Sequence, residues 1–274
     1  MDVGIQLIVC DVDGTLIGTD RKEPEELETL ADLIGRYRIP FTIASGRIPA
    51  RIEGLAKRLN LKLPVIGCNG ACAFWGDEYL WNDFLPAKQL RDGIEAADRL
   101  GMSVVFTDGK KEWACRKTPW VRDLMENYGR YDGIWKPEGT EWDSIRMQKV
   151  LIADAKNKED ASFVLEKFLP YKEVLNLVQY EDGVLDITTK SSDKGTGVKR
   201  LAESLHIPAG DIMAIGDHKN DIGMIRFAGI GAAVGNGTEE LKQCADYVCR
   251  NELAAGVIEA VRAFYLSEEL EDER

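Results

Sequence analysis

Short apolar runs alternate along the chain with longer segments in which apolar residues recur every three or four positions. The runs at 7–11, 40–44 and 64–67 predict buried strands, and the segments 24–37 and 49–59 predict amphipathic helices. The same alternation returns near the C-terminus, with a helix at 194–205, strands at 211–215, 231–234 and 246–248, and a last helix at 255–266. Strands that alternate with helices indicate a parallel, doubly wound sheet, so we expect an α/β, Rossmann-like core.

The segment between these two halves has a different pattern. Paired apolar strands turn at 108–109 and 182–183, and several amphipathic helices lie around them. An α+β segment of about a hundred residues has the normal size of one domain. We therefore predict a core made of residues 1–83 and 189–274, with an inserted cap domain at 84–188.

Two carboxylates stand at the end of the first predicted strand. Asp11 ends that strand, Asp13 follows two positions later, and Gly14 lets the backbone turn. Side chains at i and i+2 of an extended chain point to the same side, so the two acids can meet. Both can be ionised only with a cation between them, as in a metal site for attack on phosphorus. A loop cap or the acidic pocket of a receiver domain is the alternative interpretation of the pair.

A second acidic loop follows the apolar strand at 211–215. Asp217 and Asp221 lie in the sequence Gly-Asp-x-x-Asn-Asp and could complete an oxygen site for Mg²⁺. A simple helix cap is the alternative, since Asp and Asn favour that position. The location at another strand end favours convergence with Asp11. His218, in the same loop, is interpreted as an exposed side chain.

Two further features indicate a phosphate site. Lys194 stands at the start of a predicted helix, where a cation is unfavourable for the helix but well placed to meet a phosphate. An exposed, solvated lysine is the alternative. Ser45 and Gly46 follow the strand at 40–44, where a hydroxyl and free backbone N–H groups could hold phosphate oxygens. Ser-Gly is also a common turn.

These motifs occur in the order strand-DxDGT, strand-SGR, strand-NG, insert, DKG, strand-GDxxND. That order resembles the haloacid dehalogenase-like hydrolases over the whole chain, and the insert resembles the type IIB cap of Cof-type phosphatases. The sequence Gly235-Asn-Gly237 and the residues after it also resemble that subfamily. Several motifs in one order make coincidence improbable.

The resemblance implies a role for each motif. Asp11 would attack phosphorus to form an aspartyl phosphate, and Asp13 would protonate the leaving alcohol and then activate water. Asp11, the backbone carbonyl of Asp13 and Asp217 would hold Mg²⁺. Asp221 would bind the metal directly or through water, or would orient Lys194. The phosphoryl oxygens would be held by a further set: Ser45, Lys194, Asn220 and the backbone N–H groups near Val12 and Gly46.

The second Asp favours phosphate-ester hydrolysis, because a leaving alkoxide needs a proton donor. The resemblance therefore implies a Mg²⁺-dependent phosphatase of small phosphorylated metabolites, sugar phosphates first among them. A phosphomutase or phosphotransferase is one alternative, and a non-catalytic regulator that binds a phosphorylated ligand is another. Which substrate is bound, and whether the chain forms oligomers, is not encoded in the motifs.

Charge and composition exclude several other classes. Of the 274 residues, 35 are Lys or Arg and 47 are Asp or Glu, which gives a net charge of −12. Such an acidic chain is a poor partner for nucleic acid or for an anionic membrane. No run of about 20 apolar residues could span a bilayer, and the N-terminus lacks the pattern of a secretory signal. With six cysteines and no CxxC pair, we expect a cytoplasmic protein with reduced thiols.

Overall fold

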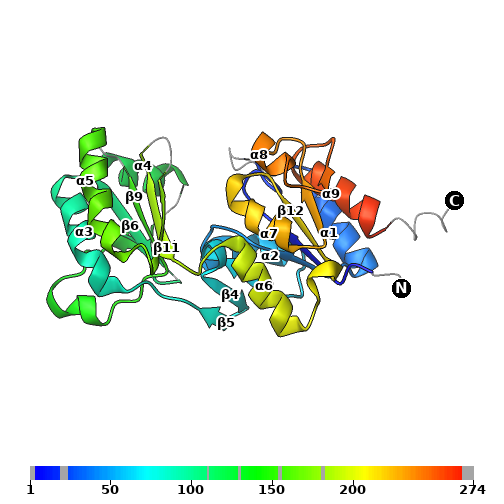
Figure 1. Ribbon diagram of the computed structural model, residues 1–274, viewed down its shortest axis with the longest axis horizontal. Coiled ribbons are helices and arrows are strands. Elements are labelled where there is room, and N and C mark those ends of the chain that lie inside the picture. The colour runs from blue at the N-terminus through cyan, green and yellow to red at the C-terminus, as the bar shows by residue number, and fades with distance from the viewer. Residues whose placement is uncertain are drawn as a thin grey trace. The chain divides into compact units, whose positions relative to one another are not determined.

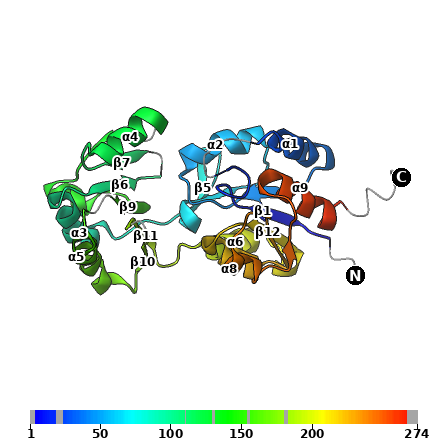
Figure 2. The ribbon, with the colours of Figure 1, turned by 90° about the horizontal axis from the view of Figure 1, so that it is seen from above.

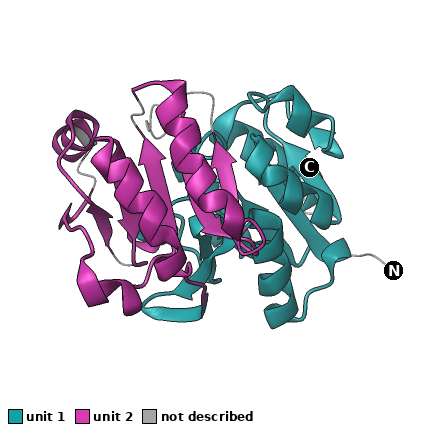
Figure 3. Ribbon diagram, turned by 60° about the vertical axis from the view of Figure 1, so that its left-hand side comes forward, with its two compact units in different colours: residues 1–47, 51–81, 193–274 teal, residues 48–50, 82–192 magenta. Residues whose placement is uncertain are grey.

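The computed structural model describes residues 4–18, 24–109, 111–128, 131–153, 156–179 and 183–266. The chain divides into two compact units (Figure 3). Unit 1 contains residues 1–47, 51–81 and 193–274, and unit 2 contains residues 48–50 and 82–192. The catalytic role expected for the first and the substrate-reading role expected for the second stay predictions.

Unit 1 is built on a five-stranded parallel sheet in the order β14-β13-β12-β1-β2. Its strands are β1 (Leu7–Cys10), β2 (Phe41–Ile43), β12 (Ile212–Gly216), β13 (Ile230–Ala233) and β14 (Tyr247–Val248). β1 is fully buried and pairs with β12 in the register Leu7 to Ile212 and Cys10 to Ile215. An apolar strand without alternation suits such a sheet, because helices cover both of its faces.

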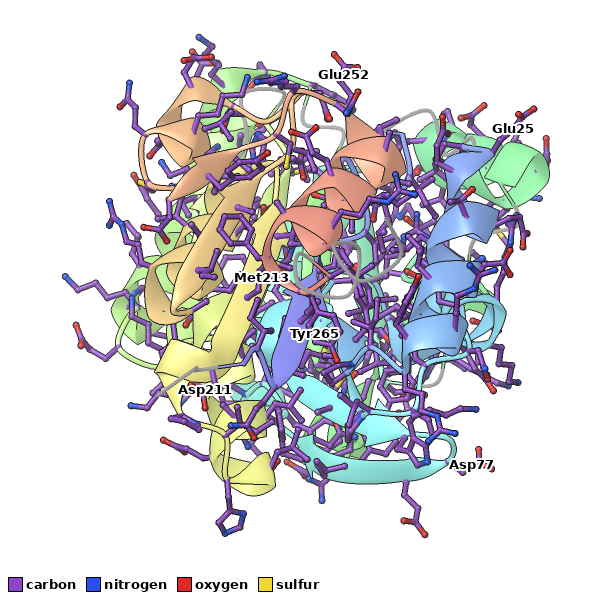
Figure 4. All side chains as sticks on the ribbon, turned by 90° about the vertical axis from the view of Figure 1, so that its right-hand side faces the viewer. Glu25, Asp77, Asp211, Met213, Glu252 and Tyr265 are labelled. Atoms are coloured by element: carbon purple, nitrogen blue, oxygen red, sulfur yellow. The ribbon has the colours of Figure 1, made fainter. Side chains whose placement is uncertain are left out.

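Two layers of helices enclose the sheet (Figures 1 and 2). Ile8 of β1 packs in a cluster with α1, α2 and α9, and its neighbour Val9 packs on the opposite side with α6, α7 and α8. Met213 of β12 lies inside the unit, whereas Asp77 points outward (Figure 4). The helices of this unit are α1 (Glu26–Tyr37), α2 (Pro49–Arg58), α6 (Lys194–Leu205), α7 (Ile222–Phe227), α8 (Glu239–Lys242) and α9 (Leu253–Phe264).

The strand expected at 64–67 is not a full member of the parallel sheet. It forms β3 (Val65–Gly67), which meets the end of β2 through a single parallel bridge from Ala44 to Ile66. β3 instead pairs antiparallel with β4 (Cys72–Trp75), and β5 (Glu78–Asn82) completes a three-stranded sheet. The hairpin that follows β3 supplies a nearby partner, so local pairing prevails over extension of the parallel sheet.

Unit 2 is an α+β structure with a six-stranded mixed sheet in the order β10-β11-β9-β6-β7-β8. α3 and α5 pack on the face that carries Phe106 and Val150, and α4 packs on the face of Val105 and Ala114. Its elements are α3 (Ala87–Arg99), β6 (Ser103–Thr107), β7 (Glu112–Ala114), α4 (Pro119–Tyr128), β8 (Gly133–Ile134), β9 (Lys149–Ala153), α5 (Lys158–Phe168), β10 (Leu175–Gln179) and β11 (Leu185–Thr189).

These two units confirm the predicted fold class, a doubly wound parallel core interrupted by an α+β insert. The turn expected at 182–183 begins outside the described residues. None of the described helices is long and apolar enough to cross a membrane. Short 3₁₀ segments complete the structure at Cys68–Gly70, Gly139–Asp143, Leu169–Tyr171, Ala209–Asp211 and Lys219–Asp221.

Candidate active site

Three carboxylates and one ammonium group meet at the carboxyl edge of the parallel sheet. Asp11 follows β1 and Asp217 follows β12, and these strands are neighbours in register. Asp221 ends the short turn after Asp217, and Lys194 is the first residue of α6. One carboxylate oxygen from each of the three acids lies within 4.8 Å of the others. Residues separated by up to 210 positions therefore share one buried site.

Lys194 is the cation at the centre of this cluster. Its Nζ lies 2.5 Å from Asp11 Oδ1 and 2.6 Å from Asp221 Oδ1, and its side chain has no exposed surface. The interpretation of Lys194 as a solvated surface lysine is therefore wrong. Burial opposes the charged ammonium, but the two carboxylates outweigh that effect and raise the pKa of Lys194, so it stays protonated.

The buried acids outnumber the cation. Burial raises the pKa of Asp11 well above its usual value, and the charge of Asp221 raises it further against the opposing effect of Lys194. Burial also raises the pKa of Asp217, although a hydrogen bond from Thr15 opposes that shift. With all groups ionised, three carboxylates and one ammonium leave two negative charges in a buried region. A divalent cation would balance them, and carboxylate oxygens are ligands that suit Mg²⁺.

Asp221 holds the loop together through both of its oxygens. Oδ1 accepts from Lys194, and Oδ2 accepts at 3.0 Å from the backbone N–H groups of Asp217 and of His218. The His218 side chain is exposed, as expected. Gly216 must be glycine, because a Cβ there would lie 2.6 Å from the Cβ of Asp221. Asp221 therefore contacts Lys194 directly, and its expected roles as a metal ligand or as the group that orients Lys194 stay predictions.

The DxDGT segment forms a tight loop behind the cluster. The N–H groups of Leu16 and Ile17 both donate to the Val12 carbonyl, and Gly14 adopts a φ of 89°. That left-handed conformation favours glycine, and a Cβ at this position would also clash with the Asp217 side chain. Thr15 Oγ1 donates to Asp217 Oδ1 at 2.9 Å, so this loop is hydrogen-bonded to one of the acids that could bind a metal.

The remaining predicted site residues lie around this centre with different exposure. Ser45 is buried at the end of β2, and its Oγ accepts from the Arg47 N–H at 3.1 Å. Gly46 lies close to Asn69, and Val12 is buried. Asn220 is exposed in the loop after β12. The side chain of Asp13 is 45% exposed and contacts Arg47.

Sequence reasoning assigned no role to three residues that shape the site. They are Thr15, which donates to Asp217; Arg47, which contacts Asp13; and Asn236, whose Nδ2 donates to the Gly14 carbonyl at 2.7 Å. Thr15 belongs to the DxDGT motif, Arg47 to the SGR motif and Asn236 to the sequence Gly-Asn-Gly at 235–237. Their partners lie at least 34 positions away, and no local pattern specifies such contacts.

Comparison with known proteins gives one family. Residues 8–261 match the model of the haloacid dehalogenase-like hydrolases. YkrA of Bacillus subtilis is 28% identical over 263 residues, which cover 94% of this chain and 96% of YkrA. The 5-amino-6-(5-phospho-D-ribitylamino)uracil phosphatase YcsE of the same organism is 26% identical over 268 residues, 97% of this chain and 98% of YcsE.

A solved structure agrees with the sequence comparison. A haloacid dehalogenase-like hydrolase from Bacteroides thetaiotaomicron superposes with a TM-score of 0.81 at 25% identity, over 94% of this chain and 98% of that chain. The chain belongs to the haloacid dehalogenase-like hydrolase family, as the order of its motifs predicted. Within that family it is a phosphatase of the Cof type that acts on small phosphorylated metabolites.

Proposed function

We propose that this phosphatase hydrolyses phosphate monoesters through an aspartyl phosphate formed on Asp11, with Mg²⁺ as its metal. The observation that carries the proposal is the contact of Lys194 Nζ with Asp11 Oδ1 at 2.5 Å inside a cluster of buried acids. A lysine held against a nucleophilic carboxylate can neutralise a phosphoryl group that arrives there. A structural ion pair would need neither the second and third acid nor their position at a strand edge.

The reaction would proceed in two displacements. An oxygen of Asp11 bonds to phosphorus while the ester P–O bond breaks, and the departing oxygen takes a proton from Asp13. Water then attacks the phosphorus of the aspartyl phosphate, loses a proton to Asp13, and releases inorganic phosphate and the free Asp11 carboxylate. Asp11, Asp217, the Asp13 carbonyl and, directly or through water, Asp221 would hold Mg²⁺, which would supply positive charge beside the phosphoryl group.

The other predicted residues would bind the phosphoryl oxygens. Lys194 is buried beside Asp11, and Ser45 ends the neighbouring strand β2, so both suit this role. We assign Asn220 and the backbone N–H groups near Val12 and Gly46 to the same task. Residues 84–188 would form the cap that reads the leaving group, and residues 1–83 and 189–274 would form the catalytic core.

For the leaving group we propose a polyhydroxylated one, as in a sugar phosphate. YcsE is described by its name as acting on a phosphoribityl compound, whose phosphate sits on a sugar-alcohol chain. Small polar substrates of this kind agree with a cytoplasmic location, which the six cysteines without a CxxC motif also favour.

The test combines a substrate panel with a variant of the nucleophile. Wild-type protein with MgCl₂ should release phosphate from p-nitrophenyl phosphate and from members of a sugar-phosphate panel, and EDTA should abolish release. Asp11→Asn should remove turnover, because an amide is not a nucleophile toward phosphorus; wild-type turnover in this variant would refute the mechanism. In H₂¹⁸O, label entering the phosphate supports hydrolysis, whereas unlabelled transfer to a second sugar would indicate a mutase. Tight binding without turnover would indicate a regulator.

A further inference from the structure

Asp13 is held by a two-point contact that its proposed role as proton donor does not explain. Arg47 Nε donates to Asp13 Oδ2 at 2.8 Å, and Arg47 Nη2 donates to Asp13 Oδ1 at 2.5 Å. Both carboxylate oxygens therefore accept from one guanidinium group. Such bidentate pairs fix geometry as well as adding energy, because the planar fork matches the carboxylate.

Arg47 itself is fixed at its backbone. Its N–H donates to Ser45 Oγ at 3.1 Å, and its carbonyl accepts from the N–H of Cys68 at 2.9 Å. Its side chain is only 23% exposed. An arginine whose backbone is hydrogen-bonded and whose side chain is largely covered can hold a partner in place, whereas a flexible surface arginine contributes little in such a pair.

Asp13 needs this support more than Asp11 does. The Asp13 side chain is 45% exposed, whereas Asp11 is almost completely buried in contact with Lys194. A half-exposed aspartate samples several rotamers in water, and only some of them can reach an ester oxygen. The contact with Arg47 selects one orientation.

We propose that Arg47 is the positioning residue that orients Asp13. Arg47 donates one hydrogen bond to each oxygen of Asp13, and one of these two bonds must break during turnover so that this oxygen can carry the proton. This inference rests on the proposed acid/base role of Asp13. As the ester P–O bond breaks, the proton of Asp13 passes to the leaving oxygen, and the carboxylate that remains is held by the guanidinium. The same carboxylate later takes a proton from the attacking water. Arg47 acts through Asp13 and forms no bond to the substrate.

The experiment is a double-mutant cycle read with two leaving groups. Arg47→Met is made in the wild-type and in the Asp13→Asn backgrounds, and turnover is measured with p-nitrophenyl phosphate and with phenyl phosphate. Phenolate is the poorer leaving group and depends more on protonation. Arg47→Met should lower kcat for phenyl phosphate by about tenfold more than for p-nitrophenyl phosphate. This is less than the roughly 10²–10⁴-fold that a whole acid/base group supplies, because Asp13 itself is still present. In the Asp13→Asn background its effect should shrink to about twofold or less, because coupled residues are not additive.

Three further measurements separate positioning from other roles. Arg47→Lys keeps the charge with a single donor point, and it should recover only part of the phenyl phosphate activity. Arg36→Met, at an exposed position on α1, serves as the matched control and should behave as wild type. Unfolding midpoints show whether any variant fails to fold. If Arg47→Met does fail, Arg47→Lys carries the cycle.

The outcomes are distinct. An equal loss with both substrates that persists in the Asp13→Asn background, together with a raised KM, would show that Arg47 binds substrate directly and would overturn the proposal. Unchanged kinetics in Arg47→Met would overturn it too. Neither result affects the role of Asp11, which the Asp11→Asn variant tests on its own. Conversely, an active Asp11→Asn variant would remove the proposed mechanism whatever Arg47 does.

Discussion

Replacement of Lys194 by methionine is the most informative single change in unit 1. The ammonium group contacts Asp11 at 2.5 Å and Asp221 at 2.6 Å, and its side chain is fully buried. Methionine has nearly the same length, so the packing of the aliphatic stem is kept while the charge is lost. The variant therefore measures what the cation contributes to a cluster of three buried acids.

The structure indicates a large effect on stability. Removal of one partner from a buried ion pair costs about 3–5 kcal/mol, because the remaining charge stays buried without compensation. Here two carboxylates lose their contact with Lys194, so we expect the upper half of that range at pH 7 in the absence of metal. Mg²⁺ at about 100 times its dissociation constant would restore roughly 2.7 kcal/mol, since it binds only the native state.

Lower pH should reduce the cost of the substitution. The pKa of Asp11 in the native protein is already raised by burial, and loss of Lys194 removes an effect that lowers it. The native state then binds more protons than the unfolded state above about pH 4, where a free aspartate titrates. Stability therefore falls as the pH rises through the native pKa, and it recovers as the pH falls. The difference between wild type and variant should shrink on acidification.

Urea denaturation with and without MgCl₂ measures these effects, and phosphate release measures activity. Lys199→Met is the matched control, because Lys199 is an exposed lysine of the same helix. Surface changes of this kind usually alter stability by no more than about 0.5 kcal/mol. For activity we expect a loss of about 10²–10³ in kcat, the cost of removing one group that stabilises transition-state charge. A Lys194→Met variant as stable and as active as Lys199→Met would refute the reasoning.

Two smaller changes test side-chain contacts, one in each unit. Thr15→Val removes the hydrogen bond that opposes the raised pKa of Asp217. The variant should bind Mg²⁺ about 10–100-fold more weakly, which is measured from the Mg²⁺ dependence of its activity. An unchanged Mg²⁺ dependence would contradict a metal role for Asp217. In unit 2, burial opposes the charge on Asp98, but hydrogen bonds at 2.6 Å from Arg116 and from Lys136 lower its pKa. Asp98→Asn should therefore lower the free energy of unfolding by about 1–2 kcal/mol at pH 7. The difference from wild type should fade when urea denaturation is repeated below about pH 4, where the carboxylate becomes protonated. An equal loss at all pH values would contradict a role for the Asp98 charge.

The sequence predicts where the site lies because three of its motifs, DxDGT, SGR and GDxxND, each follow an apolar run. Short apolar runs such as 7–11 and 211–215 favour buried strands, and parallel strands bring their carboxyl ends to one edge. The pattern therefore predicts that Asp11 and Asp217 are neighbours, as they are in the structure. The strand at 64–67 follows the same pattern, but it pairs antiparallel with β4, the strand that begins at Cys72. Local pairing of this kind depends on turn geometry that the apolar pattern does not report.

The contacts within the site were much less predictable. Lys194 was expected near a phosphate, but its dual contact with Asp11 and with Asp221 depends on the exact point at which α6 begins. The two-point contact of Arg47 with Asp13 depends on two hydrogen bonds of the Arg47 backbone, one to Ser45 Oγ and one from the Cys68 N–H, which fix the segment after β2. Side-chain pairs across 34 or 183 positions leave no periodic signal, so residue type and position at a strand end are all that sequence supplies.

The charges of this cluster favour a functional rather than a stabilising role. Well-packed apolar side chains of similar volume often stabilise a buried site as well as ions do, or better. Unit 1 instead keeps Asp11, Asp217, Asp221 and Lys194 together, with two negative charges in excess when all are ionised. An excess that folding does not require is what a site prepared for a divalent cation needs. Removal of metal should therefore destabilise the wild-type protein, whereas replacement of Lys194 should make it depend on metal more strongly.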